Sequence, residues 1–98
     1  MLRGEVWRYV PKGSPRQQTV VIVSSDGINQ SSRPWLLGAP LTADDPGDIL
    51  AVQVGTLGWV SAGNLTRLYR DWFSEQIGQL EQETLYLLDT ALRAALDL

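Results

Sequence analysis

The sequence predicts a small, mainly β domain in which a strongly curved antiparallel sheet or barrel is packed by one C-terminal α-helix. Two observations predict this fold class. Short runs rich in β-branched and aromatic residues recur along residues 1–80, and these runs are separated by Gly, Pro, Asn and Asp. That alternation is typical of strands joined by turns. The last segment changes to helical spacing, so we expect several strands and then one helix, in a single domain covering 1–98.

The strands follow one another in chain order with a turn signal after each. The expected strands are Gly4–Val10, Thr19–Ser24, Trp35–Leu41, Ile49–Val54, Trp59–Val60, Leu65–Tyr69 and a short extended piece at Glu75–Leu80. Pro11 ends the first strand, and the polar segment Lys12–Gln18 predicts a loop. The second strand is apolar from Val20 to Val23, which indicates burial on both faces. Asp26-Gly27 predicts a turn before the third strand.

The C-terminal helix is predicted by its apolar period. Its apolar stripe consists of Leu85, Leu88, Leu92, Ala95 and Leu96. No Gly or Pro interrupts this segment, and Leu, Ala and Glu are good helix formers. We therefore expect an amphipathic helix that packs this stripe against the sheet.

The composition excludes several kinds of site. The chain has no Cys and no His, so disulfides, Cys-ligated zinc and Cys or His nucleophiles and bases are excluded. Acid–base chemistry must then use carboxylates, Tyr, Lys, Arg, hydroxyls or water. No phosphate-binding loop, dinucleotide-binding glycine pattern or metal-ligand spacing is present, and we expect neither a metal nor another cofactor.

The net charge and the hydropathy limit the classes of binding partner that we expect. The net charge is −3, with seven Arg and a single Lys. This acidic balance argues against a large non-specific nucleic-acid surface but permits a small arginine cluster, whose planar forks suit phosphate. No apolar stretch approaches the roughly 20 residues that span a bilayer, and the N-terminal segment does not resemble a signal peptide. We expect a cytoplasmic protein with no membrane partner.

One candidate site lies where two predicted strands meet. Arg16, Gln17 and Gln18 precede the second strand, and Thr42 closes the third. If the two strands are antiparallel neighbours, the loop and the strand end lie at the same edge. An Arg and a hydroxyl there could grip a phosphate and stabilise its extra charge during transfer. The structural alternative is a solvated loop arginine and a turn-forming threonine.

Two other groups of residues allow both a functional and a structural interpretation. Asp44, Asp45 and Asp48 could bind a divalent cation, but the Pro46-Gly47 interruption favours a solvated hairpin tip. The four tryptophans are many for this length. We expect Trp7 and Trp35 to pack in the core or a dimer contact, whereas Trp59 and Trp72 lie in loop-like contexts that suit a partner interface or stacking on bases.

The order of these pieces resembles the MazF/PemK family over almost the whole chain. The segments that carry the resemblance are RGEVW, the KGS loop, VVIVSSDGIN, APLT and IGQLEQETLYLLDTALRAAL. The resemblance implies a small SH3-like antiparallel β-barrel with a C-terminal α-helix, and a homodimer. It also implies a bacterial type II toxin that cuts single-stranded mRNA without a metal, inhibits growth, and is blocked by a cognate antitoxin laid across the RNA groove.

The family's site residues carry over only in part. Thr42, in APLT, matches the family's active-site hydroxyl. The family typically has Arg-Pro directly before the second strand, where this chain has Gln18 and Thr19, and Arg16 stands two positions earlier. The resemblance therefore implies Arg16 and Thr42 as catalytic residues, with Gln17, Gln18 and Lys12 binding RNA. Attack by the RNA 2′-hydroxyl would give a cyclic phosphate.

Two alternatives to the nuclease remain. A binding protein on the same scaffold, with the nuclease site eroded, would keep an antitoxin or another protein partner without cleaving RNA. Gln18, Pro15 and the acidic net charge motivate this alternative. A gyrase poison of the CcdB type would share the barrel, but that family relies on a C-terminal Trp-Gly-Ile tail and this chain ends ALDL.

Overall fold

The computed structural model describes residues 1–97. The strands are β1 (Glu5–Tyr9), β2 (Gln18–Ile22), β3 (Trp35–Thr42), β4 (Ala51–Val54), β5 (Gly58–Ser61), β6 (Thr66–Tyr69) and β7 (Phe73–Gln79). Two α-helices, α1 (Asp26–Asn29) and α2 (Gln82–Leu96), and two 3₁₀ turns, η1 (Ala62–Asn64) and η2 (Arg70–Trp72), complete the described chain. The strand order along the sequence is the predicted one, with small shifts at the ends.

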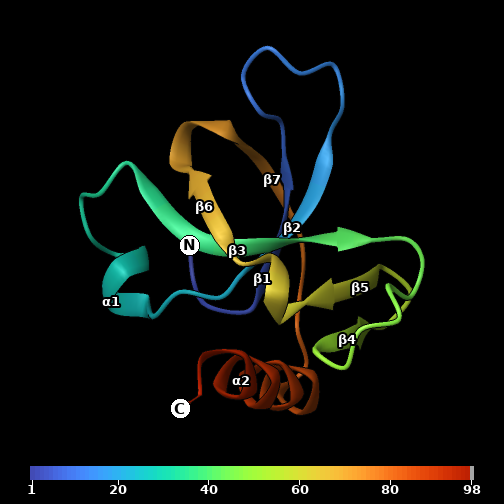
Figure 1. Cartoon of the computed structure of the whole chain (residues 1–98). Helices are drawn as coiled ribbons and strands as arrows, with labels where there is room; N and C mark the ends of the chain where they lie inside the picture. Colours follow the sequence, from blue (N-terminus) through green and yellow to red (C-terminus); the bar gives the residue numbers. More distant parts are fainter. Residues whose placement is uncertain (98) are drawn as a thin grey trace.

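The strands form one antiparallel sheet with the order β4-β5-β3-β2-β1-β7. β3 is the central strand. Along its length it pairs with β6 at residues 35–38, with β2 at residues 38–40 and with β5 at residues 41–42. The sheet curls into a half-barrel, and α2 lies across one side of it (Figure 1). A mainly β fold with an antiparallel barrel and a C-terminal helix is therefore confirmed.

The core consists of two clusters, and β2 contributes to both. Val21 packs in the cluster that includes Leu88 and Ala91 of α2, whereas Val20 and Ile22 pack in a second cluster with Leu36 and Leu68. Successive strand residues point to opposite faces of a sheet. The predicted burial of this strand on both faces is thus confirmed, and the strand is held rigidly from either side.

Two segments differ from the prediction because polar side chains cap them. The expected turn at Asp26-Gly27 is the first turn of α1, and the Asn29 side chain closes this helix by donating to the Ser24 carbonyl at 2.9 Å. The fourth strand begins at Ala51, not at Ile49. The Asp48 carboxylate accepts from the Leu50 backbone N–H at 2.7 Å and holds a turn there, which leaves Ile49 98% exposed.

The helix and the tryptophans also depart from the expected burial. In α2, Leu88 and Ala91 are buried, whereas Ala95 and Leu96 near its C-terminal end are exposed, and Leu96 lines a cavity. Trp7 packs beside the second cluster, as expected. Trp35 is half-buried and belongs to neither cluster, so it does not pack in the core, and the alternative of a dimer contact stays a prediction. Within residues 1–97, neither helix is long and apolar enough to cross a membrane.

Candidate functional site

The candidate site lies where β2 begins and β3 ends. The two strands are antiparallel, with Val20 opposite Pro40 and Ile22 opposite Gly38. The predicted antiparallel pairing of these two strands is therefore present. It ends at Val20 and Pro40: beyond that point Gln18 pairs with Tyr9 of β1, and Thr42 pairs with Trp59 of β5.

The β1–β2 loop carries the remaining candidates and rises away from β3 (Figure 1). Lys12, Arg16, Gln17 and Gln18 are all exposed. The Arg16 backbone N–H donates to the Ser14 hydroxyl at 3.3 Å, and its guanidinium has no hydrogen bond or ion pair within residues 1–97. The positive charge that would face a phosphate is therefore carried on a solvated side chain.

The Thr42 hydroxyl is engaged in the turn that follows β3. It donates to the Asp44 carbonyl at 3.0 Å. Gly58 makes the close approach of β5 possible, since a Cβ at that position would stand 2.3 Å from the Thr42 carbonyl oxygen. Gly58 also has a φ of +130°, a value that side chains rarely adopt. The backbone around Thr42 is thus tightly packed while its side chain is exposed to solvent.

The acidic residues after Thr42 organise turns. Asp48 accepts from the Leu50 N–H and from the Ser61 hydroxyl at 2.8 Å, and these hydrogen bonds hold the pKa of the Asp48 carboxyl below its usual value. Asp45 accepts from the Gly47 N–H at 2.9 Å. In the described part of the chain, no three Asp, Glu, His or Cys side chains are grouped as metal ligands. These contacts make residues 44–48 an exposed turn, but β3 and β4 do not pair in the described chain, so the segment is not the predicted hairpin tip.

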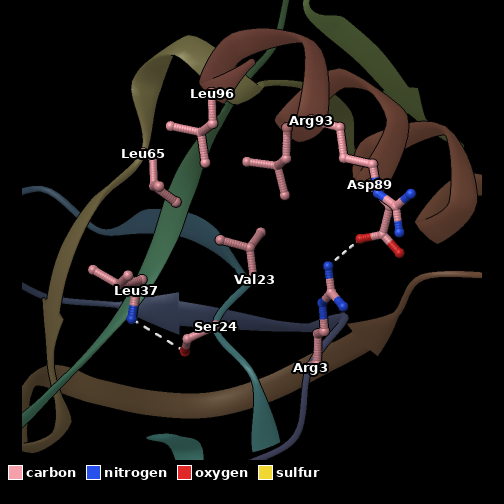
Figure 2. A pocket seen from close by; sticks show the side chains of 9 residues that line it. Arg3, Val23, Ser24, Leu37, Leu65, Asp89, Arg93 and Leu96 are labelled. Atoms are coloured by element: carbon pink, nitrogen blue, oxygen red, sulfur yellow. Dashed lines mark hydrogen bonds and ion pairs between the residues drawn. The ribbon is translucent and has the colours of Figure 1, made fainter. Parts of the chain in front are cut away.

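A cavity of about 300 Å³ lies elsewhere, between α2 and the sheet (Figure 2). It is lined by Arg3, Val23, Ser24, Leu37, Leu65, Asp89, Leu92, Arg93 and Leu96, and by none of the predicted site residues. At one edge the Arg3 guanidinium forms an ion pair with Asp89. The Arg3 backbone N–H also donates to the Asp26 carboxylate at 2.8 Å, so this region ties α1 and α2 to the N-terminal segment.

Sequence analysis missed a second group of arginines at the opposite end of β3. Arg33 and Arg67 approach the Trp35 ring, and Arg70 donates to the Ile28 and Asn29 carbonyls at the end of α1. The Arg33–Trp35 spacing was visible in the sequence. The approach of Arg67 depends on the pairing of β3 with β6, for which the sequence carried no signal.

Comparison with known proteins gives structural matches only. No model of a known protein family and no curated protein sequence matches the chain. An endoribonuclease in complex with its cognate antitoxin, from a mycobacterial species, matches with a TM-score of 0.84 and 26% identity, covering 100% of this chain and 94% of that one. An endoribonuclease from a mycobacterial species has the same TM-score and identity, with 100% and 92% covered.

A MazE–MazF complex from Deinococcus radiodurans is similar in the same way. Its TM-score is 0.83 at 18% identity, and the match covers 100% of this chain and 96% of that chain. A MazF structure from the same organism gives a TM-score of 0.81 at 17% identity. The chain therefore has the MazF fold over its whole length, and the resemblance to the MazF/PemK family that its sequence carries is confirmed by the structure.

Proposed function

We propose that this chain is the endoribonuclease toxin of a toxin–antitoxin pair, acting on single-stranded mRNA in the cytoplasm. One observation carries the proposal: a solved endoribonuclease, bound to its cognate antitoxin, matches the entire chain at a TM-score of 0.84 and 26% identity. The cognate antitoxin is accordingly the proposed inhibitor. A homodimer is the proposed assembly, in keeping with the MazF/PemK resemblance.

The proposed reaction needs no metal. The RNA 2′-hydroxyl loses its proton, its oxygen bonds to the adjacent phosphorus, and the bond to the 5′-oxygen breaks. The products are a 2′,3′-cyclic phosphate and a 5′-hydroxyl that takes up a proton. Because the chain has no His, the first proton would pass to a carboxylate or to water.

Arg16 and Thr42 are the proposed catalytic residues. Arg16 would neutralise the charge that develops on the phosphate, and Thr42 would orient the phosphate by donating its hydroxyl hydrogen, which would leave the Asp44 carbonyl. Gln18, together with the exposed Gln17 and Lys12, would bind the RNA. Arg16 is four residues from Lys12, so one loop would supply all the positive charge at this site.

The test is cleavage by purified, antitoxin-free protein in the presence of a chelator, with the new RNA ends mapped. We expect ends bearing cyclic phosphate, and loss of about a hundredfold in rate for Arg16→Ala, because one donor to developing charge is removed. Thr42→Ala should also lower the rate. Arg93→Ala, which removes a positive charge from α2, is the matched control and should cleave normally.

Two results would contradict this proposal in different ways. If the wild-type protein leaves RNA intact, the nuclease assignment is wrong. If Arg16→Ala and Arg93→Ala cleave equally well, the protein is a nuclease but Arg16 is not its phosphate ligand.

The second candidate is a binding protein with an eroded nuclease site. Two observations favour it: the Thr42 hydroxyl already donates to the Asp44 carbonyl, and the exposed Gln18, which carries no charge, stands where the MazF/PemK resemblance implies an arginine. Recovery of a small partner from the host, together with intact RNA in the cleavage assay, would support this candidate over the nuclease.

A further inference from the structure

Two arginines lie against the ring of Trp35, the first residue of β3. Arg33 precedes this strand, and Arg67 lies on the neighbouring strand β6. The Arg67 Cζ atom lies 4.6 Å from the centre of the Trp35 ring, and the Arg33 Cζ atom lies 5.9 Å from it. Both distances fall within the range in which a guanidinium is attracted to an aromatic face. The indole therefore gathers two positive charges and restricts the motion of both side chains.

These two charges are not balanced by a carboxylate. Within residues 1–97, the ion pairs are Arg3 with Asp89 and Arg8 with Glu75. Arg33 and Arg67 are exposed, and neither guanidinium donates a hydrogen bond within the described chain. Although the net charge of the chain is −3, Arg33 and Arg67 together create a local region of positive electrostatic potential.

Exposed aromatic surface accompanies the positive charge. Tyr69 is the register partner of Trp35 on β6 and is 40% exposed. Trp35 itself contributes to neither core cluster, so its ring is not required to fill the interior. Arginine forks beside accessible aromatic rings are the combination that single-stranded nucleic acids bind, with phosphates on the forks and bases on the rings.

We propose that Arg33, Trp35, Arg67 and Tyr69 form a second RNA-binding patch, which contacts single-stranded RNA outside the cleavage site. This inference rests on the proposed function for the identity of the ligand. An acidic peptide would satisfy the two arginines but would make no use of the 40% exposed Tyr69 ring, so the observations favour RNA.

The patch is separate from the proposed cleavage site. Trp35 and Thr42 are the two ends of β3 and are seven residues apart, which corresponds to roughly 23 Å along a strand. Because seven is odd, the alternation of the strand also directs the two side chains to opposite faces. The patch should therefore matter for long RNA, which can reach both regions, and hardly at all for short RNA.

The experiment measures binding of fluorescent RNA in which every 2′-hydroxyl is methylated, so that the proposed cleavage is impossible. The long RNA has about 20 nucleotides, beyond the 4–16 that a single small domain usually covers. Arg67→Gln and Arg33→Gln should each lower the slope of log affinity against log salt by about 0.7, the value for one lost phosphate contact to a single strand. Trp35→Leu should weaken long-RNA binding several-fold, because it removes the ring that holds the two guanidiniums in place.

Matched controls keep the result interpretable. Arg93→Gln removes the same charge from α2 and should leave the affinity and the salt slope unchanged. All variants are checked by thermal unfolding. Arg33 precedes β3 and its side chain is exposed, so Arg33→Gln tests the patch even if Trp35→Leu fails to fold. For an RNA of about 5 nucleotides, all of these variants should bind like the wild type.

Each outcome decides between the two proposals. Weaker long-RNA binding by the patch variants supports the patch even if wild-type protein cleaves no RNA, in which case only the nuclease assignment fails. Unchanged affinity and salt slope in Arg33→Gln and Arg67→Gln overturns the patch, whether or not the protein cleaves. Loss of binding to an acidic peptide with RNA binding intact also overturns it and assigns the arginines to a protein ligand.

Discussion

The two ends of β3 hold their positive charge in different ways. At the Thr42 end, Arg16 sits on an exposed loop without a hydrogen-bonding partner for its guanidinium within residues 1–97. At the Trp35 end, Arg33 and Arg67 are gathered by an aromatic ring. A side chain that is already ordered loses less entropy on binding than a solvated one.

This difference separates two tasks that one site often combines. The Thr42 end has the hydroxyl that the MazF/PemK resemblance marks as catalytic, but the uncharged Gln18 stands where that resemblance implies an arginine. The Trp35 end has ordered charge but no group placed for chemistry. Affinity for RNA and cleavage of RNA should therefore respond to different substitutions, and the following changes are arranged from the largest expected effect to the smallest.

Gln18→Arg should make the Thr42 end a stronger catalyst. The substitution places a guanidinium at the position where the MazF/PemK resemblance implies an arginine, and one well-placed donor to developing charge is worth about a hundredfold in rate. Initial rates on a short RNA, which does not reach the Trp35 end, provide the measurement. Gln53→Arg on β4 adds the same charge at another exposed position and is the control. Equal rates for the two variants would show that position 18 has no special relation to the phosphate.

Gly38→Ala should damage both ends at once, because Gly38 lies in the middle of β3. An added Cβ would stand 2.4 Å from Leu68 Cδ1 and 2.4 Å from the Val21 carbonyl oxygen, and the backbone atom cannot move without breaking the β2–β3 ladder. We expect the free energy of unfolding in urea to fall by about 3 kcal/mol. Gly63→Ala, where the nearest atom would be 3.4 Å away, should change it little. A similar loss in both variants would mean that the tight β2–β3 contact is not the cause.

Arg70→Met should loosen the Trp35 end alone. Arg70 donates to the Ile28 and Asn29 carbonyls, both at 2.9 Å, and to the Arg33 carbonyl, so it fixes the segment that carries Arg33. We expect a loss of about 2 kcal/mol in unfolding free energy, since these hydrogen bonds come from a charged group and leave carbonyls unpaired. Long-RNA binding should weaken while short-RNA cleavage stays normal. Arg93→Met is the control, and reduced short-RNA cleavage by Arg70→Met would show that the two ends are coupled.

Acid should loosen the turn at the Thr42 end. Hydrogen bonds from the Leu50 N–H and the Ser61 hydroxyl lower the pKa of Asp48 in the folded protein below its ordinary 3.8. The stabilisation from this carboxylate is therefore present above pH 3.8 and is lost as the pH falls through the lower folded value. The unfolding free energies of wild type and Asp48→Asn should converge below that range. Asp71→Asn, whose carboxylate makes no hydrogen bond within residues 1–97, should show no such convergence.

The elements that could be predicted are those whose apolar residues repeat at strand or helix spacing. Alternating and β-branched runs located every strand, and the Leu85–Leu88–Leu92 spacing located α2. The helix α1 was missed because it has only four residues, contains Gly27, and is closed by the side chains of Asn29 and Arg70. Such caps come from contacts that a local pattern does not encode.

The candidate sites also depend on contacts between distant segments, which local sequence patterns do not encode. That Thr42 and the start of the second strand share an edge followed from antiparallel pairing, which the sequence could suggest but not establish. The position of Arg67 beside Trp35 comes from β3–β6 pairing across about 30 residues, and no spacing in the sequence announces it. An arginine that is positioned by a strand distant in the sequence can be recognised only when the strand pairing is known.

The pairing of β1 with β7 has a consequence for synthesis on the ribosome. β1 occupies residues 5–9, and its second partner begins at Phe73. The N-terminal strand must therefore wait, with one edge open, until more than two thirds of the chain has been translated. Pairings between distant segments form slowly, and an open strand edge invites aggregation. A nascent chain stalled before β7 lacks one edge strand of its sheet, so the fold is completed only after β7 has been synthesised.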